Sequence, residues 1–207
     1  MSESAWIERW DRQQGNYLPD RDAALGMVLD VVDRVVGEPG RLVDLASGPG
    51  SIAVRAVKRF GSTRALAVDA VCSATSLHYF SAGEFAEVAR MLARRIRPDG
   101  VFVNLDTLRL GGEVPRLSAL AATLRDHSWD GSPLGDEADD WESWWADARA
   151  EPAFAELFAE RDRLAVGPTD AAPVTLPEMT EALRLAGFAE VGVLDQTADK
   201  HLIVAIR

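Results

Sequence analysis

The sequence has a single cysteine, Cys72, and no apolar run that approaches the roughly 18 residues of a membrane span. One cysteine cannot form an internal disulfide, and we expect a structural thiol at the end of a buried strand. The amino terminus lacks the basic start and apolar stretch of a secretion signal. We therefore expect a cytoplasmic protein without a membrane partner.

Basic residues are also scarce relative to acidic ones. The chain has 22 Lys and Arg against 33 Asp and Glu, a formal net charge of -11. This charge repels a phosphate backbone, so a nucleic-acid partner is disfavoured. The densest basic stretch, Arg90 to Arg97, falls on the polar side of a predicted helix, where we expect a solvated face. His127 and His201 have no partners at ligand spacing, so we expect no metal site.

The length and the apolar content of the chain fit one α/β domain. The chain has 207 residues and is 47% apolar, enough to bury a core. Residue spacing predicts helices over 20–36, 51–60, 81–96 and 176–187, and strands over 41–46, 64–71, 101–106, 189–195 and 201–206. The last two strands are too close for a parallel crossover and should pair antiparallel. We expect a single domain over 1–207 with a helical insertion at about 111–174.

A glycine-rich turn follows the first predicted strand. Residues 43–50 are V-D-L-A-S-G-P-G, and Gly48 and Gly50 let the backbone approach a ligand closely. Free N–H groups at the start of the next helix favour a carboxylate there. Residues 48–53 also satisfy the G-x-G-x-x-G/A dinucleotide fingerprint. Asp69, expected at the end of the next strand, suits the ribose of NAD or of S-adenosylmethionine equally.

Residues 43–50 resemble the first motif of class I S-adenosylmethionine-dependent methyltransferases, D-x-G-x-G-x-G, with Ala46 at the first glycine. Residues 69–80 resemble the family's fourth-strand run "DAVxSxxxLH", and 97–104 the turn into its fifth strand. The resemblance implies a Rossmann-like sheet, mostly parallel with a C-terminal antiparallel pair, and S-adenosylmethionine as cofactor. We interpret Ala46 as tolerated because the position needs smallness more than a positive φ. The implied cofactor-binding residues are Asp44, Ala46, Gly48, Gly50 and Asp69.

The chain departs from the family pattern at one point. Asp69 would be both the acid after the second strand and the start of the fourth-strand run. The segment between those two core strands is therefore interpreted as missing, which leaves about five strands. The strand over 64–71 could take the second or the fourth position, and we favour the fourth because the chain continues to the strand at Val101. The first strand would then be an exposed edge, through which a homodimer could form.

The sequence does not identify a catalytic residue. His78, beside Tyr79, and Asp106 both follow or end strands, where a general base or a substrate contact could lie. The insertion carries Trp141, Trp144 and Trp145, which suit a packing stripe more than a substrate wall. Methyl transfer to a small molecule is the favoured function. The alternatives are a degenerate module that acts by binding or oligomerisation, and an NAD-dependent oxidoreductase without a clear hydride site.

Overall fold

The computed structural model describes residues 3–15, 18, 20–60, 68–127, 140–163 and 171–207. It divides into two compact units, each described here by itself. The smaller contains Met1–Arg21 and Gly131–Pro168, and the larger contains Asp22–Asp130 and Thr169–Arg207. The insertion contains helices, as predicted, but its first helix, α5 (Pro115–His127), belongs to the larger unit. Whether the chain folds as one domain stays a prediction.

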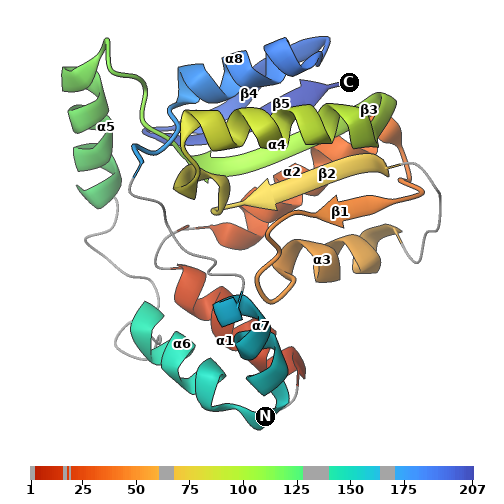
Figure 1. Ribbon diagram of the computed structural model, residues 1–207, viewed down its shortest axis with the longest axis vertical. Helices are drawn as coiled ribbons and strands as arrows, with labels where there is room; N and C mark the ends of the chain where they lie inside the picture. The colour runs from red at the N-terminus through yellow and green to blue at the C-terminus, as the bar shows by residue number, and fades with distance from the viewer. Residues whose placement is uncertain (1–2, 16–17, 19, 61–67, 128–139, 164–170) are drawn as a thin grey trace. The chain divides into compact units, whose positions relative to one another are not determined.

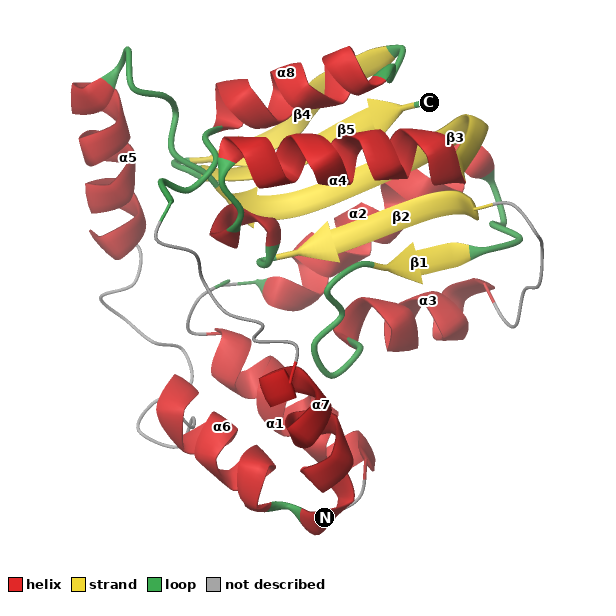
Figure 2. Cartoon of the chain, in the orientation of Figure 1, coloured by secondary structure: helices red, strands yellow, loops and turns green. Residues whose placement is uncertain are grey.

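The larger unit is built on a five-stranded mixed sheet (Figures 1 and 2). The strands are β1 (Leu42–Asp44), β2 (Val68–Ala74), β3 (Ile96–Thr107), β4 (Glu190–Thr197) and β5 (Lys200–Ile206). Their order is β1-β2-β3-β5-β4, with β1, β2 and β3 parallel and β5 antiparallel to both of its neighbours. The predicted sheet is confirmed, and β2 takes the favoured position between β1 and β3.

Two strand boundaries differ from prediction. β2 continues to Ala74, so Cys72 lies fully buried inside the strand rather than at its end. β3 begins at Ile96 and includes an irregularity near Asp99, whose φ is 60°. Gly100 follows because a Cβ there would lie 2.7 Å from the carbonyl oxygen of Asp69. The predicted turn at 98–100 is thus a bulge within a longer strand.

Two helices cover one face of the sheet, α4 (Ala82–Arg95) and α8 (Leu176–Ala186). Each begins at a predicted capping box, Ser81 with Glu84 and Thr175 with Glu178, because the serine or threonine oxygen accepts a hydrogen bond from an otherwise unpaired N–H group. The buried side chains between these helices and the strands include Val71, Phe85, Phe102, Met179, Leu183 and Ile203. This core fixes α4 and α8 against the sheet.

The opposite face carries α2 (Arg21–Val36) and α3 (Ser51–Phe60). Val71 faces α4, so its strand neighbour Cys72 and the register partner of Cys72, Asp44, face the other way. Asp44 contacts the first turn of α3 on that side. Arg59 of α3 in turn pairs with two aspartates of α2. Helices α3 and α4 therefore lie on opposite faces.

The two crossover connections of the parallel strands have opposite hands. Both advance the chain by one strand in the same direction, from β1 to β2 and from β2 to β3, although their helices lie on opposite faces. Figure 1 shows β2–α4–β3 as the usual right-handed unit, so β1–α3–β2 is left-handed. Only about 2% of such connections have that hand. A right-handed connection through α3 would instead lead to the outer side of β1.

The smaller unit is formed by helices around an aromatic cluster. Its elements are α1 (Glu3–Gly15), α6 (Trp141–Ala150), a 3-10 turn (Pro152–Phe154) and α7 (Ala155–Arg163). Trp144 is buried, with its ring centroid 5.7 Å from that of Trp6 and 4.5 Å from that of Trp10. Trp6, Trp10 and Trp144 form the core of the unit, which agrees with the packing interpretation for Trp144, whereas Trp141 is 37% exposed. None of the helices described in either unit is long and apolar enough to cross a membrane.

Candidate functional site

The carboxyl ends of β1, β2 and β3 lie at one edge of the sheet, where open α/β sheets bind ligands. Three features meet this edge. The glycine turn of residues 45–50 follows β1, a 3-10 turn over Leu77–Tyr79 follows β2, and Asp106 lies near the end of β3. The sequence predicted the glycine turn and gave His78 and Asp106 as candidates, and the structure brings these two residues into direct contact.

The glycine turn has a left-handed backbone at three positions. The φ angles are 58° at Ala46, 52° at Gly48 and 92° at Gly50, and the Gly50 N–H donates to the Ser47 carbonyl at 2.9 Å. Ala46, Ser47 and Gly48 are exposed, so the turn presents backbone to solvent. The interpretation of Ala46 as a position without a positive φ is wrong. The alanine occupies a conformation that favours glycine.

Asp44 is engaged by the helix that follows the turn. Its Oδ2 accepts a hydrogen bond from the Ala53 N–H at 3.0 Å. One of the N–H groups expected to receive a ligand carboxylate is therefore bound by the chain's own acid. Burial, together with the nearby Asp44 charge, raises the pKa of the Cys72 thiol well above its ordinary value. Cys72 is thus an inert buried thiol, as expected.

Asp69 lies at the other edge of the sheet. It is the second residue of β2, at the amino end of the strand, and the expectation that it ends the strand is wrong. One carboxylate oxygen accepts the Arg41 N–H at 2.7 Å, and the other pairs with Arg97. Burial opposes its ionisation, but these hydrogen bonds outweigh burial and hold the pKa of Asp69 below 3.8. Asp69 therefore joins the chain segments that begin three strands and is not placed to hold a ribose at the glycine turn.

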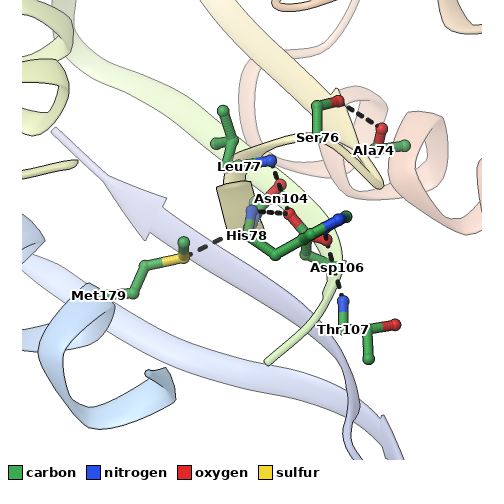
Figure 3. Close-up of polar contacts among 8 residues, drawn as sticks. All are labelled: Ala74, Ser76, Leu77, His78, Asn104, Asp106, Thr107 and Met179. Carbon is green, nitrogen blue, oxygen red and sulfur yellow. Dashed lines mark hydrogen bonds and ion pairs between the residues drawn. The ribbon is translucent and has the colours of Figure 1, made fainter. Parts of the chain in front are cut away.

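His78 and Asp106 form a hydrogen-bonded pair at the carboxyl edge (Figure 3). The Nδ1 of His78 lies 2.5 Å from Oδ1 of Asp106. Oδ2 of Asp106 accepts the N–H groups of Leu77 at 2.9 Å and His78 at 3.1 Å, and Oδ1 also accepts the Thr107 N–H at 3.0 Å. Asp106 is fully buried, and these four hydrogen bonds compensate the cost of burying its charge.

This environment orients the imidazole and changes its proton affinity. Because Asp106 accepts only, Nδ1 carries the shared hydrogen and Nε2 is the lone-pair nitrogen of the neutral ring. Burial lowers the pKa of His78, but the hydrogen bond and charge of Asp106 raise it more, so the net pKa lies above 6.5. The side chain is 29% exposed, which leaves access for a reacting group. The pair has the arrangement of a general base and the residue that orients it.

Sequence analysis missed buried polar groups beside this pair. The Nδ2 of Asn104 donates weakly to Met179 Sδ at 3.5 Å, and His201 is the register partner of Asp106 across β3 and β5. Neither ring nitrogen of His201 makes a hydrogen bond of ordinary geometry with the described residues. Burial lowers the pKa of His201 below 6.5, although Asp199 and Asp106 oppose the change. The sequence did contain a signal for such groups, because polar residues occupy alternate positions in an otherwise apolar strand, as over 102–106.

Two hollows of the larger unit are lined by other residues. One, of about 690 Å³, is lined by the ends of α4 and α8 and the start of β3. The other, of about 420 Å³, is an apolar groove between α4 and α8. The described residues contain no group of three or more metal-ligating side chains. We base the candidate site on the glycine turn and the His78–Asp106 pair, because neither hollow contains any of these residues.

Comparison with solved structures identifies similar folds. Human N-acetylserotonin methyltransferase in complex with S-adenosylmethionine matches 100% of this chain and 56% of its own, with a TM-score of 0.52 and 14% identity. An O-methyltransferase family protein from Burkholderia thailandensis matches 94% of this chain and 63% of its own, with a TM-score of 0.49 and 18% identity. The chain thus spans between about half and two-thirds of these proteins. No family model and no curated protein sequence matches it. At such identities the similarity shows the fold alone.

Proposed function

From the fold of class I S-adenosylmethionine-dependent methyltransferases, which this chain has, we propose that it transfers a methyl group to a hydroxyl oxygen of a small molecule. The observation that carries the proposal is the His78–Asp106 pair, located at the carboxyl edge of the sheet together with the glycine turn. A hydroxyl group is a weak nucleophile until it loses its proton. A positioned base at this edge therefore favours oxygen acceptors.

The residues present fit one end of the cofactor. The exposed backbone at Ser47 and Gly48 suits the methionine carboxylate, because left-handed glycine turns present N–H groups to anions. When bound, the cofactor supplies a methyl group activated by the adjacent sulfonium. No residue is assigned to the ribose, because Asp69 lies at the opposite edge. Each lost hydrogen bond to a carboxylate costs on the order of 1.5–3 kcal/mol, so we expect weak cofactor binding.

In this proposal His78 and Asp106 have different roles. Nε2 of His78 would accept the proton of the substrate hydroxyl, so that the oxygen could take the methyl group while its carbon–sulfur bond breaks and a neutral thioether leaves. The carboxylate of Asp106 keeps the other nitrogen protonated and stabilises the imidazolium that results. The raised pKa of His78 means that the neutral base prevails only above that pKa. Activity should therefore rise as the pH increases through it.

The test measures cofactor binding and methyl transfer separately. S-adenosylmethionine is titrated calorimetrically into the full chain, and labelled cofactor is then incubated with a panel of small hydroxyl compounds. We expect weak binding, turnover of at least one compound, and a loss of roughly 10²–10⁴-fold in kcat in His78→Gln with little change in binding. An Arg116→Gln variant, altered on the exposed face of α5, serves as the matched control. Equal turnover by His78→Gln and the control would remove His78 from the mechanism.

A second candidate is a methyltransferase-like module that acts by binding without catalysis. The observation in its favour is the Asp44–Ala53 hydrogen bond, which fills part of the anion site with the chain's own carboxylate. Absence of cofactor binding, combined with concentration-dependent association in light scattering, would favour this candidate. Methyl transfer to a hydroxyl compound by a monomer would exclude it in favour of the enzyme.

A further inference from the structure

An arginine-rich hollow lies at the edge of the sheet opposite the His78–Asp106 pair. Its volume is about 690 Å³, within the range of about 300–1,000 Å³ typical of small-molecule sites. Five of its nine lining residues are arginines, and none of the nine has a carboxylate side chain. The arginines are Arg90, Arg94, Arg95, Arg97 and Arg207. On a chain with a net charge of -11, such a set is a local concentration of positive charge.

Three of these arginines already have partners. Arg207 donates from Nε to the Ala93 carbonyl at 2.7 Å and from Nη1 to the Gly187 carbonyl at 2.9 Å. Arg97 pairs with Asp69, and Arg90 pairs with an acid on its own helix. Arg207 therefore satisfies carbonyl groups at the ends of both α4 and α8, while Arg97 is fixed by an ion pair.

Arg94 and Arg95 differ from the other three. Both are exposed, and neither guanidinium group forms a hydrogen bond or an ion pair with any residue in the described part of the chain. Positive charges near the carboxyl terminus of a helix interact favourably with the helix dipole. This interaction would be a purely structural role for Arg94 and Arg95. Arg207 already donates to a carbonyl of the last turn of α4. Two further unpaired guanidinium groups on a rigid helix end, facing one hollow, exceed what that role requires.

We propose that the arginine-rich hollow binds a polyphosphate group, with Arg94 and Arg95 as its main contacts. The planar guanidinium fork matches phosphate oxygens, and two adjacent forks suit a chain of phosphates better than a single one. The guanidinium group of Arg207, held by two neutral carbonyl groups, adds positive charge to the same hollow, whereas the charge of Arg97 is balanced by Asp69. The overall acidity of the chain disfavours a duplex nucleic acid and leaves small polyphosphates as the ligand class.

The test titrates tripolyphosphate, ATP and orthophosphate calorimetrically into the full chain at low salt. We expect tripolyphosphate to bind at least about tenfold more tightly than orthophosphate, with an affinity that falls as salt is added. Equal affinities for tripolyphosphate and ATP would mean that the hollow recognises the polyphosphate alone. Tighter binding of ATP would mean that its ligand is a nucleotide. Absence of binding by both would overturn the proposal.

Substitutions distinguish binding at this hollow from a nonspecific attraction of phosphate to positive charge. The double variant Arg94→Gln/Arg95→Gln should lose at least about tenfold in affinity, whereas Arg116→Gln, an exposed arginine on another helix, should bind as the wild type does. Arg94→Lys/Arg95→Lys keeps the charge without the fork and should bind with intermediate affinity. Equal losses in the double glutamine variant and the control would overturn the proposal. The lysine variant decides the question if the glutamine variant does not fold, and its result is independent of the proposed methyl transfer.

Discussion

Replacing Ala46 by glycine should stabilise the protein, contrary to the usual effect of this substitution. Ala46 has a φ of 58° and is exposed, so its methyl group contributes little burial. A left-handed conformation costs a non-glycine residue roughly 1–2 kcal/mol. Glycine loses roughly 0.5–1 kcal/mol more backbone entropy on folding than alanine. The difference predicts a gain of about 0.5–1 kcal/mol for Ala46→Gly, because strain relief exceeds the entropy cost.

Gly50→Ala is the matched control in the same turn. Gly50 has a φ of 92°, and an added Cβ would meet only Ala53 Cβ, at 4.0 Å. No clash accompanies the change, so the backbone term alone should destabilise the protein by about 0.5–1 kcal/mol. Urea unfolding and thermal unfolding, each followed by circular dichroism, compare both variants with the wild type. In a chain of this length the melting temperatures should move in opposite directions by about 1–4 °C. A loss of stability in Ala46→Gly would refute the strain argument.

Three further substitutions test the charged groups. In Asp106→Asn the pKa of His78 should fall below 6.5, because burial remains after the carboxylate is removed, and a histidine NMR titration would detect the change. His201 has a lowered pKa in the folded state, so the free energy of unfolding should decrease as the pH falls below 6.5. In His201→Gln this decrease should be smaller, and an unchanged slope of the free energy of unfolding against pH would contradict the assignment. Asp69→Asn should lower the free energy of unfolding, measured with urea, by about 1–3 kcal/mol at neutral pH. The difference from the wild type should shrink as the pH falls below 3.8 and through the lowered pKa of Asp69.

The regular elements were predictable because local chemistry specifies them. Two capping boxes, Ser81 with Glu84 and Thr175 with Glu178, indicate where two helices begin. Gly187, which has a left-handed backbone, ends α8 as expected. The antiparallel pairing of β4 and β5 followed from the short link between them. These features depend on residues close together in sequence. Sequence alone was therefore sufficient for them.

The site was predicted less completely because its contacts are nonlocal. His78 and Asp106 were separate candidates, and only the parallel pairing of β2 and β3 brings residues 28 positions apart into contact. Asp69 was misplaced because a buried strand of continuous apolar residues gives no periodicity from which to read its end. The positive φ of Ala46 was missed although Ala46 stands at the first glycine of the motif, because alanine itself does not indicate a left-handed conformation.

The left-handed connection through α3 gives a physical reason to regard the sheet as shortened at β1. A right-handed connection from β1 through α3 would deliver the chain to the outer side of β1, where the described residues place no strand. β1 is instead a three-residue edge strand, and all of its residues are partly exposed. Parallel strands are usually covered on both faces and flanked by neighbours. Because β3 is buried over most of its length and paired on both sides, we expect the amides of β1 to exchange with solvent faster than those of β3. Equal protection of the two strands would mean that the outer side of β1 is covered.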